Sequence, residues 1–210
     1  MNSGPTRQRV TRGYYFSTRD LALIALVSAA GGVLSTYVGY LGNLMNRALG
    51  VPFGAGQWMA GLHVFWFVLV RVLVGRTGAG ALAGLLKGVV EMFSGSTHGL
   101  PIVLISAIQG LLVDVVLLPF PAPTLPLLCL AGGIASASNV IVFQILYFSG
   151  VSWGYIALIT LFAFLSGMIF GGYFASGILD IVEGAHLLAS ASRKRRQGGS
   201  RLRLALTVVM

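Results

Sequence analysis

Residues 21–40 read LALIALVSAAGGVLSTYVGY and contain no charged side chain. The hydrocarbon core of a bilayer is about 30 Å thick, and a helix needs about 20 apolar residues to cross it. This stretch therefore predicts a transmembrane helix. The whole chain agrees, because 56% of its 210 residues are hydrophobic, only 9% are charged and the mean hydropathy is +0.88.

Five further apolar runs of helical length follow, separated by segments punctuated with glycine and proline. Together with the first run they predict an all-α fold, a polytopic membrane protein with a six-transmembrane-helix bundle. The predicted helices are residues 21–40, 58–74, 78–93, 102–118, 125–148 and 155–182.

The net charge of +9 is concentrated at the two ends of the chain, as in the run 193–196, and around Arg71 and Arg76. Basic residues that flank apolar helices set membrane orientation, so we read them as topology signals and expect no nucleic-acid partner. They predict a plasma-membrane protein with both termini cytoplasmic. Residues 1–19 and 191–210 are then basic cytoplasmic tails around a six-helix membrane domain, residues 20–190.

Glu91 and Lys87 are the ionisable residues that lipid should exclude most strongly. They stand four residues apart on one face of the third predicted helix, near its outer end. An intramembrane carboxylate usually faces a cavity or a partner, which favours Glu91 as a substrate-binding residue. Lys87 is either its counter-ion or a second ligand contact, and an internal pair that neutralises itself is the simpler alternative.

Other polar and aromatic residues gather toward the same side of the membrane. Gln57, Trp58 and Trp66 enter the second helix, Gln109 lies in the fourth, and Tyr147 ends the fifth. Amides and aromatic rings of this kind can surround a flat heterocycle, so we expect these five residues in the substrate site. For Trp58, an anchor in the interfacial aromatic belt is about as good an interpretation.

Three other polar residues are better explained by packing. No histidine or cysteine stands at metal-ligand spacing from His63, so we expect His63 to be a hydrogen-bonded packing residue. We expect no metal site and no cofactor. Asn139 is read as a hydrogen bond between helices, and Asp114 as a structural carboxylate.

Small residues form a stripe on the first helix, at Ala22, Ala25 and Ala29. Small residues four apart let two helices approach closely. The stripe predicts either a docking surface for a partner subunit or packing inside the bundle, and spacing alone does not separate these.

Several segments keep the order and spacing of a known family. They are Leu41-Gly42-Asn43, residues 77–82 leading to Val90-Glu91, residues 94–101, residues 108–111 with Asp114, and residues 130–132. By these the chain resembles the substrate-binding S components of energy-coupling factor (ECF) vitamin transporters, in particular the YkoE-like branch for thiamine and its hydroxymethylpyrimidine precursor.

The resemblance implies a subunit that captures thiamine, or its pyrimidine precursor, from outside for ATP-driven uptake. Its implied partners are a transmembrane coupling subunit, which would contact Ala22, Ala25 and Ala29, and two cytoplasmic ATPases. The chain departs from the family pattern at Lys87, where a small residue is usual, and at Gln57, where a carboxylate is usual.

The sequence carries no Walker, zincin or nucleophile-elbow motif, so we expect no enzyme activity in this chain and ATP hydrolysis in separate subunits. Three alternatives stay open. They are a membrane enzyme that uses His63 or His98 with Ser94, a solitary carrier or channel, and an S component for a different vitamin.

Overall fold

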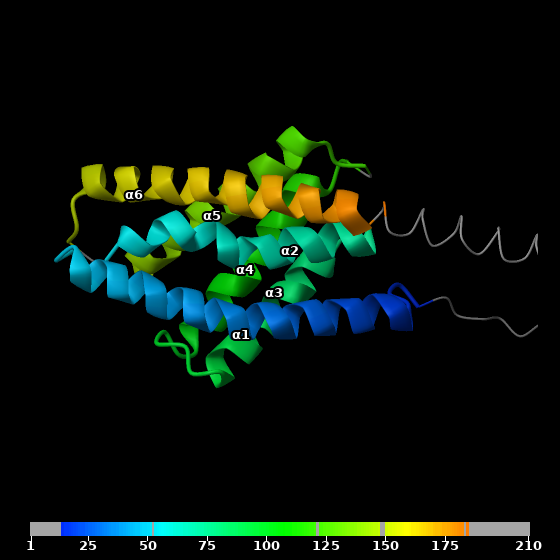
Figure 1. The fold of residues 1–210 in the computed structure, drawn as a ribbon, viewed down its shortest axis with the longest axis horizontal. Coiled ribbons are helices and arrows are strands. Elements are labelled where there is room, and N and C mark those ends of the chain that lie inside the picture. The colour runs from blue at the N-terminus through cyan, green and yellow to red at the C-terminus, as the bar shows by residue number, and fades with distance from the viewer. Residues whose placement is uncertain (1–13, 52, 121, 148–149, 183, 185–210) are drawn as a thin grey trace, which may run out of the picture.

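The computed structural model describes residues 14–51, 53–120, 122–147, 150–182 and 184 (Figure 1). The C-terminal tail predicted for residues 191–210, and most of the N-terminal tail, lie outside this part of the chain. The described residues contain helices and no strand, which confirms the all-α class. The elements are α1 (Thr18–Ala48), η1 (Ala55–Met59), α2 (Ala60–Val74), α3 (Ala79–Phe93), α4 (Pro101–Leu117), α5 (Leu125–Tyr147), α6 (Trp153–Ser166) and the π-helical η2 (Gly167–Tyr173), after which the helix continues to residue 182.

Local chemistry explains where several helices begin and end. Ser17 and Asp20 form a capping box at the start of α1, each side chain bonding the backbone N–H of the other. Pro101 occupies the first turn of α4, where its missing N–H costs nothing. Gly75 and Gly78 have φ of 66° and 87°, and they make the tight turn between α2 and α3.

Four helical segments are long and apolar enough to cross a membrane: Thr18–Ala48, Ala55–Val74, Leu125–Tyr147 and Trp153–Val182. The apolar helix Pro101–Leu117 is shorter, and α3 has 15 residues. All six predicted helices are present, but the prediction of six crossings stays a prediction. Helix α1 runs eight residues beyond the predicted Tyr40, and this extension brings polar residues to the site described below.

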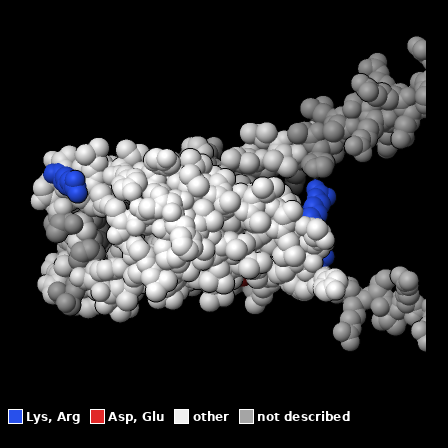
Figure 2. Space-filling model, turned by 90° about the horizontal axis from the view of Figure 1, so that it is seen from below, with Lys and Arg blue, Asp and Glu red and all other residues white. Residues whose placement is uncertain are grey.

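The charge distribution suits a bundle surrounded by lipid. Apolar side chains cover much of the outer surface, and the face in Figure 2 shows lysine and arginine only near its two ends. Both ends of the described chain lie at the same end of the bundle as the α2–α3 turn, on the right in Figure 1. We call this the terminal end, and the other end, with the α3–α4 loop, the distal end.

Backbone contact between helices depends on glycine. A Cβ atom at Gly84 of α3 would lie 2.2 Å from the carbonyl oxygen of Ser106 in α4, and one at Gly132 of α5 would lie 2.3 Å from that of Gly167. No side chain fits at these distances, so glycine allows these helices to pack backbone against backbone.

We predict that Gly84→Val will sharply reduce the yield of folded protein, because its side chain would drive α3 away from α4. Overpacking typically costs about 1–3 kcal/mol and can cost more where backbone must move. Size-exclusion profiles and thermal stability in detergent measure the effect. Gly177→Val is the matched control, since a Cβ there meets nothing within 4 Å. Equal stability of Gly84→Val and wild type would contradict the packing argument.

A buried carboxylate joins α3 to α4 and α2 near the terminal end. Asp114 Oδ1 lies 3.0 Å from Arg71 Nε, and its two oxygens accept from the N–H groups of Gly80 and Ala81 at 3.3 and 2.7 Å. The first N–H groups of a helix have no partner within it, and a carboxylate also complements the helix dipole there. Asp114 thus has the structural role predicted for it, and it sets the position of α3 three turns before Glu91.

Candidate substrate-binding site

A cavity of about 170 Å³ lies among α1, η1, α2, α3, α4 and α5, toward the distal end. Polar side chains form half of its wall, and they come from every one of these elements and from the α3–α4 loop. They are Thr36, Asn43, Asn46, Gln57, His63, Glu91, Ser96, Thr97, His98, Gln109 and Asn139. A concave site with several convergent polar groups is the usual form of a small-molecule site.

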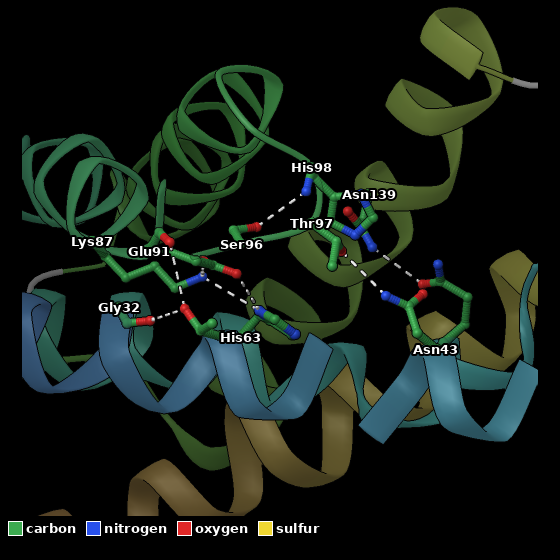
Figure 3. Close-up of polar contacts among 11 residues, drawn as sticks. Gly32, Asn43, His63, Lys87, Glu91, Ser96, Thr97, His98 and Asn139 are labelled. Carbon is green, nitrogen blue, oxygen red and sulfur yellow. Dashed lines mark hydrogen bonds and ion pairs between the residues drawn. The ribbon is translucent and has the colours of Figure 1, made fainter. Parts of the chain in front are cut away.

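The charged part of the site is a cluster of three residues from α2 and α3 (Figure 3). The ammonium group of Lys87 donates to Glu91 Oε2 and lies 3.3 Å from His63 Nδ1, while His63 Nδ1 lies 3.6 Å from Glu91 Oε1. Lys87 is fully buried and Glu91 is 2% exposed. Glu91 and His63 line the cavity, and Lys87 stands behind them.

The α3–α4 loop covers the cavity at its distal end. Tyr40 and Asn43 of α1 hold the loop by hydrogen bonds, Tyr40 Oη to the Gly95 carbonyl at 2.7 Å and Asn43 Nδ2 to Thr97 Oγ1 at 3.1 Å. Gly95 and Gly99 have positive φ angles of 96° and 58°, which allow the loop to turn back over the site.

His98 of the loop also forms part of the cavity wall. Its ring contacts Phe143 of α5 with the centroids 4.8 Å apart, and both residues line the cavity. Burial lowers the pKa of His98 below its ordinary value of 6.5, which favours the neutral ring. A neutral imidazole can offer both a donor and an acceptor to a ligand.

Amide side chains on the opposite wall are fixed by one another and by the backbone. Asn139 Nδ2 donates to Gln57 Oε1 at 3.2 Å, and the Ala55 N–H donates to Asn46 Oδ1 at 2.9 Å. Asn139 therefore links helices, as predicted, and it also lines the cavity. These bonds restrain the amide groups of Asn46, Gln57 and Asn139.

The structure brings together part of the predicted site. Glu91, Gln109 and Gln57 line the cavity, and Lys87 contacts Glu91.

The three predicted aromatic residues lie outside the cavity lining. Trp58 is 56% exposed and Tyr147 is 47% exposed, while the Trp66 side chain packs over Gly31, where a Cβ would lie 2.6 Å from its ring. Tyr147 still touches the site indirectly, because its hydroxyl donates to the His98 carbonyl at 3.5 Å. The rings that line the cavity belong instead to Phe53, Phe143 and the two histidines.

Sequence reasoning gave Asn43, Asn46 and Phe143 no role in the site. It placed His63 among the hydrogen-bonding groups of the second helix but preferred a packing role for it. The signal for the two asparagines is their spacing of three residues directly after an apolar helix, which places them on one face if the helix continues. Ending the predicted helix at Tyr40 hid that face. Among the described residues, no group of three histidine, cysteine or acidic side chains is placed to hold a metal ion.

The small-residue stripe on α1 faces away from the bundle. Ala22, Ala25 and Ala29 are all exposed, whereas Ser28, Gly31 and Gly32 on the other side of α1 are buried. The stripe therefore lies on the outer surface of the bundle, and its role in docking stays a prediction.

Comparisons with known proteins agree with this fold. Residues 19–138 match the family described as "ABC-type cobalt transport system, permease component". A solved structure described as "Crystal structure of an S-component of ECF transporter" superposes with a TM-score of 0.75, covering 89% of this chain and 98% of that one at 20% identity, which shows a shared fold. No curated protein sequence gives a significant match. The family match extends over more than half of the chain, from α1 into α5, so the chain belongs to the family of permease components of ABC-type cobalt transport systems.

Proposed function

We propose that this chain is the substrate-binding subunit of an ECF-type ABC importer and that it captures thiamine or its hydroxymethylpyrimidine precursor in the cavity around Glu91. The single observation that carries the proposal is the cavity itself. Its wall has one carboxylate, several amides and two histidine rings that can be neutral. Such a wall suits a small nitrogen-rich ring that both donates and accepts hydrogen bonds. The transporter family and the S-component fold support the same role.

The size of the cavity favours the smaller of the two ligands. Pockets for drug-sized molecules measure about 300–1,000 Å³, and this cavity measures about 170 Å³. A single substituted ring matches that volume better than the two linked rings of thiamine. The family description names cobalt. A cobalt ion in this cavity would have to compete with Lys87 for Glu91, whose Oε2 already accepts a hydrogen bond from the ammonium group.

Identifying the molecule that co-purifies with the detergent-solubilised protein tests the proposal directly. Mass spectrometry of the denatured sample is expected to find an aminopyrimidine. Calorimetric titration with hydroxymethylpyrimidine, thiamine and Co²⁺ gives the second measurement. Saturable binding of Co²⁺ with no binding of either organic ligand would overturn the proposal.

We further propose that a transmembrane coupling subunit docks on the exposed stripe Ala22, Ala25 and Ala29, and that two cytoplasmic ATPase subunits supply the energy. The same mode of action requires six crossings with the cavity outside and both termini in the cytoplasm, in the plasma membrane. The location of the basic residues supports this orientation.

The orientation is testable by cysteine labelling in cells. In a Cys129→Ala background, Ser94→Cys is expected to react with an impermeant maleimide from outside, because Ser94 is exposed in the distal loop. Thr18→Cys, at the terminal end, is expected to react only after the membrane is permeabilised. Labelling of both positions from one side would contradict the six-span topology.

A further inference from the structure

Lys87 is the least expected residue in the site, because it is a fully buried cation inside an apolar bundle. Its ammonium group has three partners. It donates to Glu91 Oε2, lies 3.3 Å from His63 Nδ1 and stands 5.5 Å from the centre of the Phe67 ring. A buried charge is tolerated where it is paired and hydrogen-bonded, and Lys87 meets that condition.

The contact between Lys87 and His63 decides which ring nitrogen carries the proton. An ammonium group is a donor only, so His63 Nδ1 accepts from Lys87 and carries no hydrogen. The hydrogen of the neutral ring then sits on Nε2. In Figure 3 the second ring nitrogen of His63 points away from Lys87, and His63 lines the cavity. The ring therefore carries its N–H on the side away from Lys87.

The contact between Lys87 and Glu91 sets the charge of the site. Glu91 is the one acidic residue among the described residues that line the cavity, and no lysine or arginine belongs to that lining. Paired with Lys87, the carboxylate has no unbalanced negative charge to offer a cation. A cationic ligand would lose its hydration on entry and gain no free counter-charge.

We propose that Lys87 is a positioning residue that makes the site selective for an uncharged ring with a hydrogen-bond acceptor next to a hydrogen-bond donor. His63 Nε2–H faces the ligand's acceptor, and Glu91 Oε1 faces its N–H donor. The ring nitrogen and exocyclic amine of an aminopyrimidine have this arrangement. The inference rests on the proposed function for its ligand, but the state of His63 does not depend on any ligand.

The first test examines His63 by itself. Nitrogen-15 NMR of the full-length protein, labelled at histidine and held in nanodiscs, distinguishes the two neutral tautomers. The His63 signals are assigned as those absent from His63→Gln. We expect the Nε2–H form in wild type, with conversion to a mixture of tautomers in Lys87→Met. A wild-type His63 protonated at Nδ1 would overturn the inference whatever the protein binds.

The second test measures selectivity with two matched ligands. Hydroxymethylpyrimidine is uncharged, and thiamine carries the same aminopyrimidine ring with a cationic thiazolium attached. Wild type is expected to prefer the uncharged ligand. Lys87→Met is expected to bind it at least about tenfold more weakly, the effect of losing about one charged-group hydrogen bond, and to shift the preference toward thiamine.

Substitutions of His63 keep the test decisive if Lys87→Met fails to fold. Glutamine places its amide nitrogen near the position of Nε2, and asparagine near that of Nδ1, so His63→Gln is expected to retain more affinity than His63→Asn. Tighter binding by His63→Asn than by His63→Gln would overturn the role of Lys87 but leave the proposed function standing. An unchanged ligand preference in Lys87→Met would do the same. Absence of binding to both ligands by wild type would instead overturn the proposed function.

Discussion

Glu91→Gln is expected to weaken binding of hydroxymethylpyrimidine by about 1.5–3 kcal/mol, the usual contribution of a hydrogen bond to a charged group. Glu91 is 2% exposed and lines the cavity, so no water replaces the lost interaction at low cost. The substitution also leaves the ammonium group of Lys87 without its carboxylate. Breaking a buried pair in this way typically costs about 3–5 kcal/mol of stability. Thermal unfolding and ligand titration measure the two effects separately.

The double variant Lys87→Met with Glu91→Gln separates binding from folding. Replacing both members of a buried ion pair is often neutral for stability, so this variant is expected to recover the thermal stability of wild type. It is not expected to recover binding, because the carboxylate acceptor is still absent. Full binding by the double variant would remove Glu91 from the substrate site and leave the pair a purely structural role.

Ala29→Trp is expected to abolish substrate uptake while leaving ligand binding by the isolated subunit unchanged. Ala29 is exposed on the outer side of α1, and a large ring there would keep a second helix from packing against the small-residue stripe. The cavity lies on other elements and on the inner side of α1. Uptake by cells that express the complete transporter and titration of the purified subunit measure the two activities.

Ala157→Trp is the matched control, because Ala157 is exposed on α6, away from the stripe. It is expected to reduce neither uptake nor binding. A parallel loss of both activities in Ala29→Trp would show that the substitution disturbs the bundle itself. Loss of uptake in Ala157→Trp as well would show that any bulky substitution on the surface blocks transport, and the docking prediction would then fail.

The prediction for Ala29 depends on the two faces of α1, which have different surroundings. Helix α1 presents Thr36, Asn43 and Asn46 to the cavity, while its alanine stripe faces outward. Binding and partner docking can therefore be altered independently by substitutions on one helix. This separation is what makes the paired measurements informative.

The helical class and the position of every long helix could be predicted from the sequence alone, because an apolar run near the length of a bilayer crossing has few other stable conformations. Local patterns also placed Glu91 beside Lys87, since residues four apart on a helix are neighbours in any tertiary fold.

Which residues share the cavity became clear only from the packing of the helices. Gln57, Gln109 and Asn139 come from three elements far apart in the chain, and no periodicity within one helix encodes their meeting. The predicted roles of Trp58 and Trp66 depended on the direction of each ring, which is set by packing against α6 and α1. The contact of Lys87 with His63 likewise required α2 and α3 to be placed side by side, because 24 residues separate the two along the chain. Short-range geometry is set by the helix itself, whereas contacts between helices depend on close packing that a single sequence does not reveal.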